Sequence, residues 1–159
     1  LKVVQIAYGV FYPVQTFTKS KAVDFRKVPI CIEASDISTE KILEKLAHTI
    51  CDHVAVLDSE DRQRLHIGAV FACNFTNHLL ALSHSWLSRH GIPPQILDPL
   101  IIETLNKGLA QNPALFQTGP AIRKDQITIE KQLKMLEQDA RLYEIYKLLT
   151  ESIQTFKST

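Results

Sequence analysis

Residues 62–81 read RQRLHIGAVFACNFTNHLLA, a mostly apolar stretch that contains the polar side chains His66, Asn74, Asn77 and His78. On an α-helix, which turns by about 100° per residue, these four side chains fall on one arc roughly 120° wide. A helix that is apolar nearly all round is normally buried, and buried amides and imidazoles need hydrogen-bonding partners. The stretch therefore predicts a buried helix that carries a site.

The spacing of the polar residues limits the chemistry of this helix. A rise of about 1.5 Å per residue separates His66 from His78 by roughly 18 Å, so the two imidazoles cannot bind one metal ion. Asn74 and His78 lie one turn apart and can contact the same ligand. The alternative is a core helix whose amides and imidazoles are satisfied by neighbouring helices or across a dimer.

The sequence on the two sides of residue 59 predicts different structures. Before it, we expect a strand–helix–strand unit typical of mixed α/β sheets, with strands over 9–12, 28–34 and 53–58 and a helix over 38–50. After it, only helices are expected, over 59–90, 94–111, 126–138 and 140–156, and Gly91 is expected to end the first of them. We therefore predict two domains, 1–58 and 59–159.

The composition excludes several partners and cofactors. A chain of 159 residues with a net charge of +1 is enough for one domain or part of two, and it has no electrostatic attraction to nucleic acid. No apolar run approaches the ~20 residues of a membrane span, so no membrane partner is expected. No metal site is expected, because the spacings CxxC and HExxH are absent. Three scattered cysteines, Cys31, Cys51 and Cys73, predict reduced thiols and a cytoplasmic protein.

Residues 12–17, YPVQTF, follow the carboxyl end of the first predicted strand. Ligands of open α/β sheets bind outside the carboxyl ends of the strands, which makes Gln15 and Thr16 candidate ligand-binding residues. The alternative is a turn at the edge of the sheet, with Thr16 hydrogen-bonded to its own backbone.

Residues 118–125, TGPAIRKD, form a second candidate loop. Thr118 can present a hydroxyl, and Arg123 offers a planar guanidinium that fits a carboxylate or a phosphate. The alternative is a turn between two helices, in which Asp125 caps the next helix and Arg123 pairs locally.

The order of four motifs resembles a family of bacterial NADP oxidoreductase-like proteins: YPVQTF, LHIGAVFACNFTNHLLAL, DPLIIETL and TGPAIRKD. In that family a Rossmann domain precedes a helical domain akin to those of pyrroline-5-carboxylate reductase and 6-phosphogluconate dehydrogenase. The resemblance implies the fold class: an α/β remnant, made of the last strands of a Rossmann-like sheet, followed by an all-α domain of the 6-phosphogluconate dehydrogenase C-terminal type. The five glycines here cannot form the GxGxxG fingerprint, which would lie upstream of Leu1.

The resemblance also implies a function, that of an oxidoreductase that uses NADP or NAD on a small carbonyl, imine or hydroxy-acid substrate. By position, it implies catalytic residues His66, Asn74 and His78, substrate-binding residues Thr118, Arg123 and Asp125, and cofactor-binding residues Pro13, Gln15 and Thr16. The lysine that acts as acid or base in the hydroxyacid dehydrogenases would fall at Val70, which argues against that particular mechanism. The apolar helix predicts a homodimer. The alternative function is a non-catalytic helical dimerisation or ligand-binding module.

Overall fold

The backbone forms two compact units, which meet in sequence between Asn77 and His78. The computed structural model describes residues 6–19 and 22–156. The division by backbone contacts falls inside the long helix, and the predicted domain boundary near residue 59 stays a prediction.

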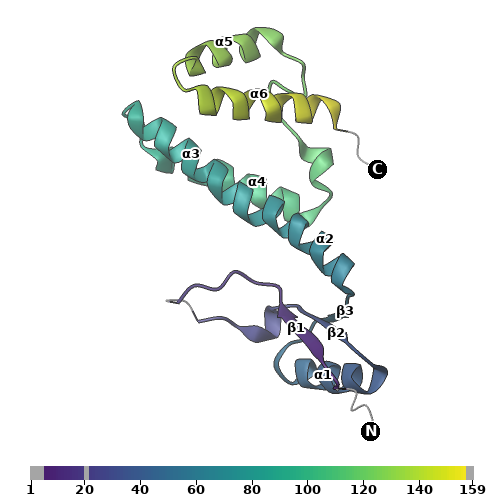
Figure 1. Cartoon of the computed structure of the whole chain (residues 1–159). Helices are drawn as coiled ribbons and strands as arrows, with labels where there is room; N and C mark the ends of the chain where they lie inside the picture. The colour runs from purple at the N-terminus through teal and green to yellow at the C-terminus, as the bar shows by residue number, and fades with distance from the viewer. Residues whose placement is uncertain (1–5, 20–21, 157–159) are drawn as a thin grey trace. The chain divides into compact units, whose positions relative to one another are not determined.

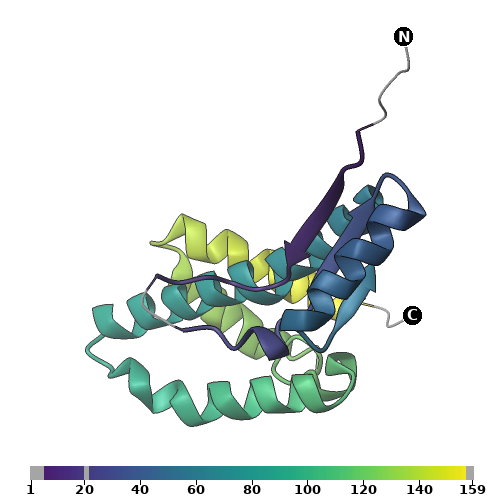
Figure 2. The same cartoon turned by 90° about the horizontal axis from the view of Figure 1, so that it is seen from below.

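The first unit contains a three-stranded mixed sheet, shown in Figures 1 and 2. Its strands are β1 (Gly9–Pro13), β2 (Ile30–Ala34) and β3 (Val54–Val56), in that spatial order. β1 is antiparallel to β2, and β2 is parallel to β3. A short 3-10 helix, η1 (Phe25–Lys27), precedes β2, and α1 (Ile37–Ile50) joins the parallel pair. The predicted strand–helix–strand unit in a mixed sheet is thus confirmed.

The core of the first unit lies between β2 and α1. Ile30 and Ile32 alternate along β2 and are fully buried against Ala47 of α1 and Cys51, the residue that follows α1. Cys31, on the other face of the strand, is also buried, and burial raises the pKa of its thiol. Burial on both faces explains why β2 has three apolar residues in succession.

The long helix runs from Ser59 to Arg89 and consists of three segments. α2 (Ser59–Ala69) is followed by a π-helical turn, η2 (Val70–Phe75), and by α3 (Thr76–Arg89). None of the residues in these segments is buried, and Ile67 and Phe71 are 59% and 63% exposed. The prediction of a buried helix is therefore wrong for the single chain. Periodicity shows that a face is apolar, but not whether the same chain covers it.

The same helix corrects the expectation about membrane spans. By length and composition alone, Ser59–Arg89 is long and apolar enough to cross a membrane, as core helices of soluble proteins also are. The possible span was not evident from the sequence, because the apolar run is interrupted, mainly by Asn, Thr, Ser and His. The apolar residues between them keep the mean hydropathy of the run at 1.3.

The second unit is helical. After α3 come η3 (Pro94–Leu97), α4 (Asp98–Ala110), η4 (Pro113–Phe116), α5 (Gln126–Leu136) and α6 (Ala140–Thr155). α3 ends at Arg89, and Gly91 forms the turn that terminates it, as predicted, with a φ of 70° that favours glycine. The Gly91 and Ile92 amides donate to the carbonyls of Ser88 and Leu87, which closes a Schellman motif. α5 and α6 lie side by side (Figure 1).

Candidate functional site

An open cavity of about 450 Å³ lies in the first unit between β1 and α2. Tyr12, near the end of β1, lines it together with Arg62, Gln63, His66 and Ile67 of α2. The helical spacing of four places Arg62 and His66 one turn apart on the same side of α2. The structure thus brings His66, a candidate on the long helix, to the end of the strand that precedes the YPVQTF loop.

Arg62 is held in place by a cluster that joins α2 to β2. Its guanidinium donates from Nη1 to Glu33 Oε2 at 2.5 Å and from Nη2 to Ser59 Oγ at 3.0 Å. The Ser59 hydroxyl in turn donates to Glu33 Oε2 at 3.0 Å. The side chains of Arg62 and Glu33 are only 23% and 31% exposed, so solvent screens this ion pair less than a fully exposed one. The cluster fixes the first turns of α2 against the sheet.

The pKa of Glu33 follows from these contacts. The hydrogen bonds from Arg62, and then from Ser59, hold the pKa of this carboxyl below its ordinary value. A lowered carboxyl pKa means that the pair stabilises the fold above the ordinary carboxyl pKa. That contribution is lost only as the pH falls through the lowered value. The Glu33–Arg62 pair is therefore intact at neutral pH.

Sequence reasoning missed Glu33 as a site residue. A signal was present, because Glu33 is the one charged residue in the apolar strand VPICIEA. A carboxylate in such a strand needs a partner. The partner could not be named from the sequence, since Arg62 lies 29 residues further along the chain.

The candidates Pro13, Gln15 and Thr16 follow Tyr12 closely in the sequence, but none of them lines the cavity. Pro13 is the last residue of β1 and pairs with Ile30, and the Val14 amide donates to the Pro29 carbonyl. The Gln15 side chain accepts a hydrogen bond from the Thr16 amide at 2.8 Å, and both residues are exposed. This hydrogen bond differs from the one foreseen in the alternative, in which Thr16 bonds to its own backbone, because its acceptor is the Gln15 side chain.

Asn74 lies inside the π-helical turn and is exposed. A π turn closes i→i+5 hydrogen bonds in place of i→i+4. The residues that follow it are therefore turned about the helix axis by roughly 100°, the angle of one residue, relative to a regular helix. The Thr76 hydroxyl, which donates to the Phe71 carbonyl five residues earlier, follows the same spacing. The angles of the polar arc assumed an α-helix throughout, so they do not apply beyond residue 70. π turns are frequent at functional sites, which keeps Asn74 a candidate.

His78 and the TGPAIRKD loop belong to the second unit. His78, Thr118 and Arg123 are exposed, and the loop turns at Gly119 with a φ of 102°. Asp125 caps α5: its Oδ1 accepts from the Thr128 amide at 3.1 Å and its Oδ2 from the Thr128 hydroxyl at 2.8 Å. The capping role foreseen as the alternative for Asp125 is thus present, and these hydrogen bonds lower the pKa of Asp125.

Replacing this cap gives a local test. We expect Asp125→Ala to fray the first turn of α5, because the Thr128 amide loses its acceptor. Hydrogen exchange at the Thr128 amide should become several-fold faster. Asp125→Asn, which keeps an acceptor oxygen, should change it little. Equal exchange rates in the two variants would show that the cap does not hold this turn.

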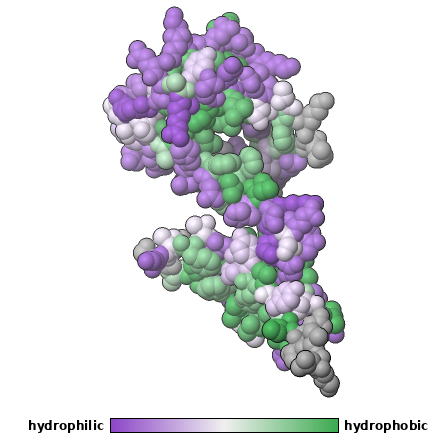
Figure 3. Space-filling model, viewed as in Figure 1, coloured by the Kyte–Doolittle hydropathy of each residue, from purple (hydrophilic) through white to green (hydrophobic). Residues whose placement is uncertain are grey.

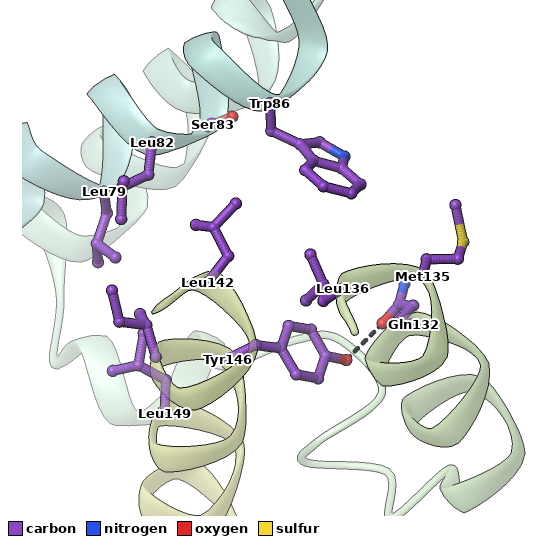
Figure 4. Close-up of a pocket in the computed structure, with 11 residues that line it drawn as sticks. Leu79, Leu82, Ser83, Trp86, Gln132, Met135, Leu136, Leu142, Tyr146 and Leu149 are labelled. Atoms are coloured by element: carbon purple, nitrogen blue, oxygen red, sulfur yellow. Dashed lines mark hydrogen bonds between the residues drawn. The ribbon is translucent and has the colours of Figure 1, made fainter. Parts of the chain in front are cut away.

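A second cavity, of about 390 Å³, is an apolar groove on the second unit, drawn in Figure 4. α3 contributes Leu79, Leu82 and Trp86, and α5 and α6 contribute Met135, Leu142 and Leu149. In this groove the Tyr146 hydroxyl donates a hydrogen bond to Gln132 Oε1 at 2.5 Å. Figure 3 shows apolar side chains, in green, at the surface of the protein. This groove has the chemistry of a packing surface and not of a reaction site.

In the described residues 6–19 and 22–156, no group of three or more His, Cys, Asp or Glu side chains could hold a metal ion. The chemistry available in the first cavity is that of a phenol, an amide and an imidazole. Such groups orient polar substrates and exchange protons.

Comparisons with known proteins identify the family. Residues 28–153 match the family described as "Domain of unknown function (DUF2520)", and the chain belongs to it. A "putative NADP oxidoreductase" from Bacteroides fragilis has a similar crystal structure, with 42% sequence identity and a TM-score of 0.88. The match covers 98% of this chain and 60% of that one.

A crystal structure of a protein from Thermotoga maritima is also similar, with 25% identity and a TM-score of 0.70. The match covers 92% of this chain and 62% of that one. No protein in the curated comparison matches. The chain thus spans about three fifths of the length of the two solved structures.

Proposed function

We propose that this chain is the C-terminal portion of an oxidoreductase that uses NADP or NAD on a small carbonyl, imine or hydroxy-acid substrate. The likeness to a structure named as an NADP oxidoreductase, of which the chain spans 60%, supports this proposal. The three-stranded sheet would complete a Rossmann-like sheet. The helices would form a domain like those of pyrroline-5-carboxylate reductase and 6-phosphogluconate dehydrogenase. The comparisons favour this function over a non-catalytic module.

The observation that carries the proposal is the cavity that joins His66 to the end of β1. Nucleotide cofactors bind at the carboxyl ends of strands in open α/β sheets. We apply this rule to β1, whose carboxyl end lies beside the amino end of the antiparallel strand β2. The neighbouring residues Pro13, Gln15 and Thr16 are therefore suited to contact the nicotinamide half of the cofactor. The residues of this chain cannot bind phosphate through a GxGxxG loop, because its five glycines are too widely spaced.

Proton transfer is the task proposed for His66. When bound, NADPH supplies a hydride, which adds to the carbonyl or imine carbon. His66, in its protonated form, would give a proton to the carbonyl oxygen or imine nitrogen and become the neutral imidazole, so that an alcohol or amine results. Tyr12, on the opposite wall, can donate a hydrogen bond to the same atom. This chain has Val70 at the position where the related dehydrogenases have a lysine. In the proposal, His66 donates the proton in place of that lysine.

The remaining candidates have supporting roles in the proposal. Asn74 and His78 would orient the substrate from the long helix, and Thr118 and Arg123 would hold an anionic group of it. Asp125 would act through its cap, which fixes the end of the loop that carries Thr118 and Arg123.

The function can be tested on the full-length protein with defined probes. NADPH binding is measured by cofactor fluorescence, and NADPH oxidation is measured with methylglyoxal, pyruvate and 1-pyrroline as aldehyde, keto-acid and imine. We expect NADPH to bind, and His66→Ala, Asn74→Ala and Arg123→Ala to reduce oxidation. Unchanged oxidation in all three variants would refute the site, and a failure to bind NADPH or NADH would refute the function.

We also propose that the protein forms a homodimer through the apolar groove. A two-fold dimer needs a self-complementary surface, and α3 offers both apolar side chains and one wall of the groove. Light scattering at micromolar concentration should give twice the mass of one polypeptide. Met135→Asp, in the groove, should shift the mass towards the monomer. Ile127→Asp, on the same helix α5 and 83% exposed, should leave the dimer intact. A monomeric wild-type protein would contradict the proposal.

We propose that the protein is soluble and works in the cytoplasm. Cys31 and Cys51 are buried free thiols, as expected of a reducing compartment. The partner subunit and the rest of the polypeptide would then cover the long helix in place of lipid. A small-molecule substrate is the only other partner proposed, because a net charge of +1 gives no attraction to nucleic acid.

A further inference from the structure

We infer that Glu33 sets the specificity of the cavity at His66. By neutralising Arg62, it makes the cavity select an uncharged polar group, such as a ketone, aldehyde, imine or carboxamide, over a carboxylate or phosphate. The inference rests on the proposed function and narrows its substrate class. Among the small carbonyl, imine and hydroxy-acid substrates, it favours the first two.

The first step concerns Arg62, the guanidinium in the cavity lining. An arginine beside a candidate acid or base normally indicates an anionic ligand, because its guanidinium fits a carboxylate. Here each terminal nitrogen of Arg62 already has one N–H group bonded, Nη1 to the Glu33 carboxylate and Nη2 to the Ser59 hydroxyl. An incoming anion would have to share this guanidinium with the Glu33 carboxylate, in an ion pair that is three-quarters shielded on the arginine side.

The second step concerns the remaining lining groups. Tyr12, Gln63 and His66 offer a phenol, an amide and an imidazole, which together provide hydrogen-bond donors and acceptors. A carbonyl oxygen can accept from any of the three. A carboxylate gains the same hydrogen bonds, but the neutralised Arg62 gives it no net charge attraction to offset the larger cost of removing it from water. The balance of charge therefore favours the neutral group.

The test compares two probes that differ only in charge, lactamide and lactate, on the full-length protein. Binding is followed by NMR through the shift of the His66 ring signals. We expect lactamide to bind wild type about tenfold more tightly than lactate, the factor of roughly one charge-assisted hydrogen bond. Glu33→Gln should free Arg62 and reverse the preference, because the guanidinium then takes the lactate carboxylate.

Three further variants make the outcome specific. Arg62→Gln should weaken lactate binding further, because Glu33 is then an uncompensated anion beside the cavity. The double variant E33Q/R62Q should restore the lactamide preference, and it also tests the charge effect if Glu33→Gln alone does not fold. Glu60→Gln removes the same charge from α2, where Glu60 pairs with Arg64 and does not line the cavity. It should leave the wild-type preference unchanged.

Three results would overturn the inference: a wild-type preference for lactate, the same preference in Glu33→Gln as in wild type, or no shift of the His66 signals with either probe. NADPH binding and oxidation are measured on the same samples. If NADPH binds and is oxidised while the preference does not depend on Glu33, the inference fails and the proposed function stands. If NADPH does not bind while the preference follows Glu33, the oxidoreductase function fails and the specificity stands.

Discussion

Ile32→Ala is expected to lower the free energy of unfolding of the first unit by about 2–5 kcal/mol. Ile32 is fully buried and packs with Ile30, Ala47 and Cys51. Truncation to alanine removes buried methyl groups and leaves a cavity that the strand and helix cannot close by a small shift. Native-state hydrogen exchange at the Ile30 amide, which donates to His53, measures the change within this unit.

The matched control is Val56→Ala on β3. Val56 is the registered partner of Ile32, but its side chain is 53% exposed. Its truncation should cost less than about 1 kcal/mol, because little buried surface is lost. If the two variants destabilised the unit equally, the core would not lie between β2 and α1. The prediction bears on function because the same sheet holds Tyr12 and Glu33.

His66→Ala is expected to reduce kcat/KM for NADPH oxidation by about 10²–10⁴-fold in the full-length protein. This is the range that a positioned proton donor contributes, and no other imidazole lines the cavity. NADPH affinity should change little, since the proposal gives His66 a proton and not a cofactor contact. A loss confined to the catalytic step would separate this role from a structural one.

His84→Ala is the control for this substitution. His84 is an exposed histidine on α3, in the same long helix, and it lines none of the cavities described here. Its loss should leave kcat/KM close to the wild-type value. A fall of less than threefold in His66→Ala, or an equal fall in both variants, would rule out His66 as the proton donor.

The strands and helices could be predicted because their signals are local. The apolar run at Ile30–Ile32, the helical pattern of residues 59–90 and the glycine at 91 each specify backbone structure within a few residues. Burial could not be predicted in the same way. The long helix is apolar nearly all round, but what covers it depends on surfaces beyond its own sequence.

The candidate site was predictable only in part. His66 was indicated by a polar residue in an apolar helix, and the end of β1 by strand direction, but their meeting in one cavity depends on the order of the sheet. The π turn around Asn74 has no compositional signal, since it follows from a one-residue shift of backbone hydrogen bonds. Asp125 was ambiguous, because a carboxylate before a helix suits both a cap and a ligand.

The most direct test of the central claim is an NMR measurement of contact between His66 and the cofactor. NADP⁺ is added to the full-length protein, and nuclear Overhauser effects are recorded between the His66 ring protons and the nicotinamide protons. We expect these cross-peaks to appear, together with cross-peaks to Tyr12 on the other wall of the cavity. Bound NADP⁺ whose nicotinamide shows cross-peaks to other residues and none to His66 or Tyr12 would contradict the claim that this cavity is the reaction site.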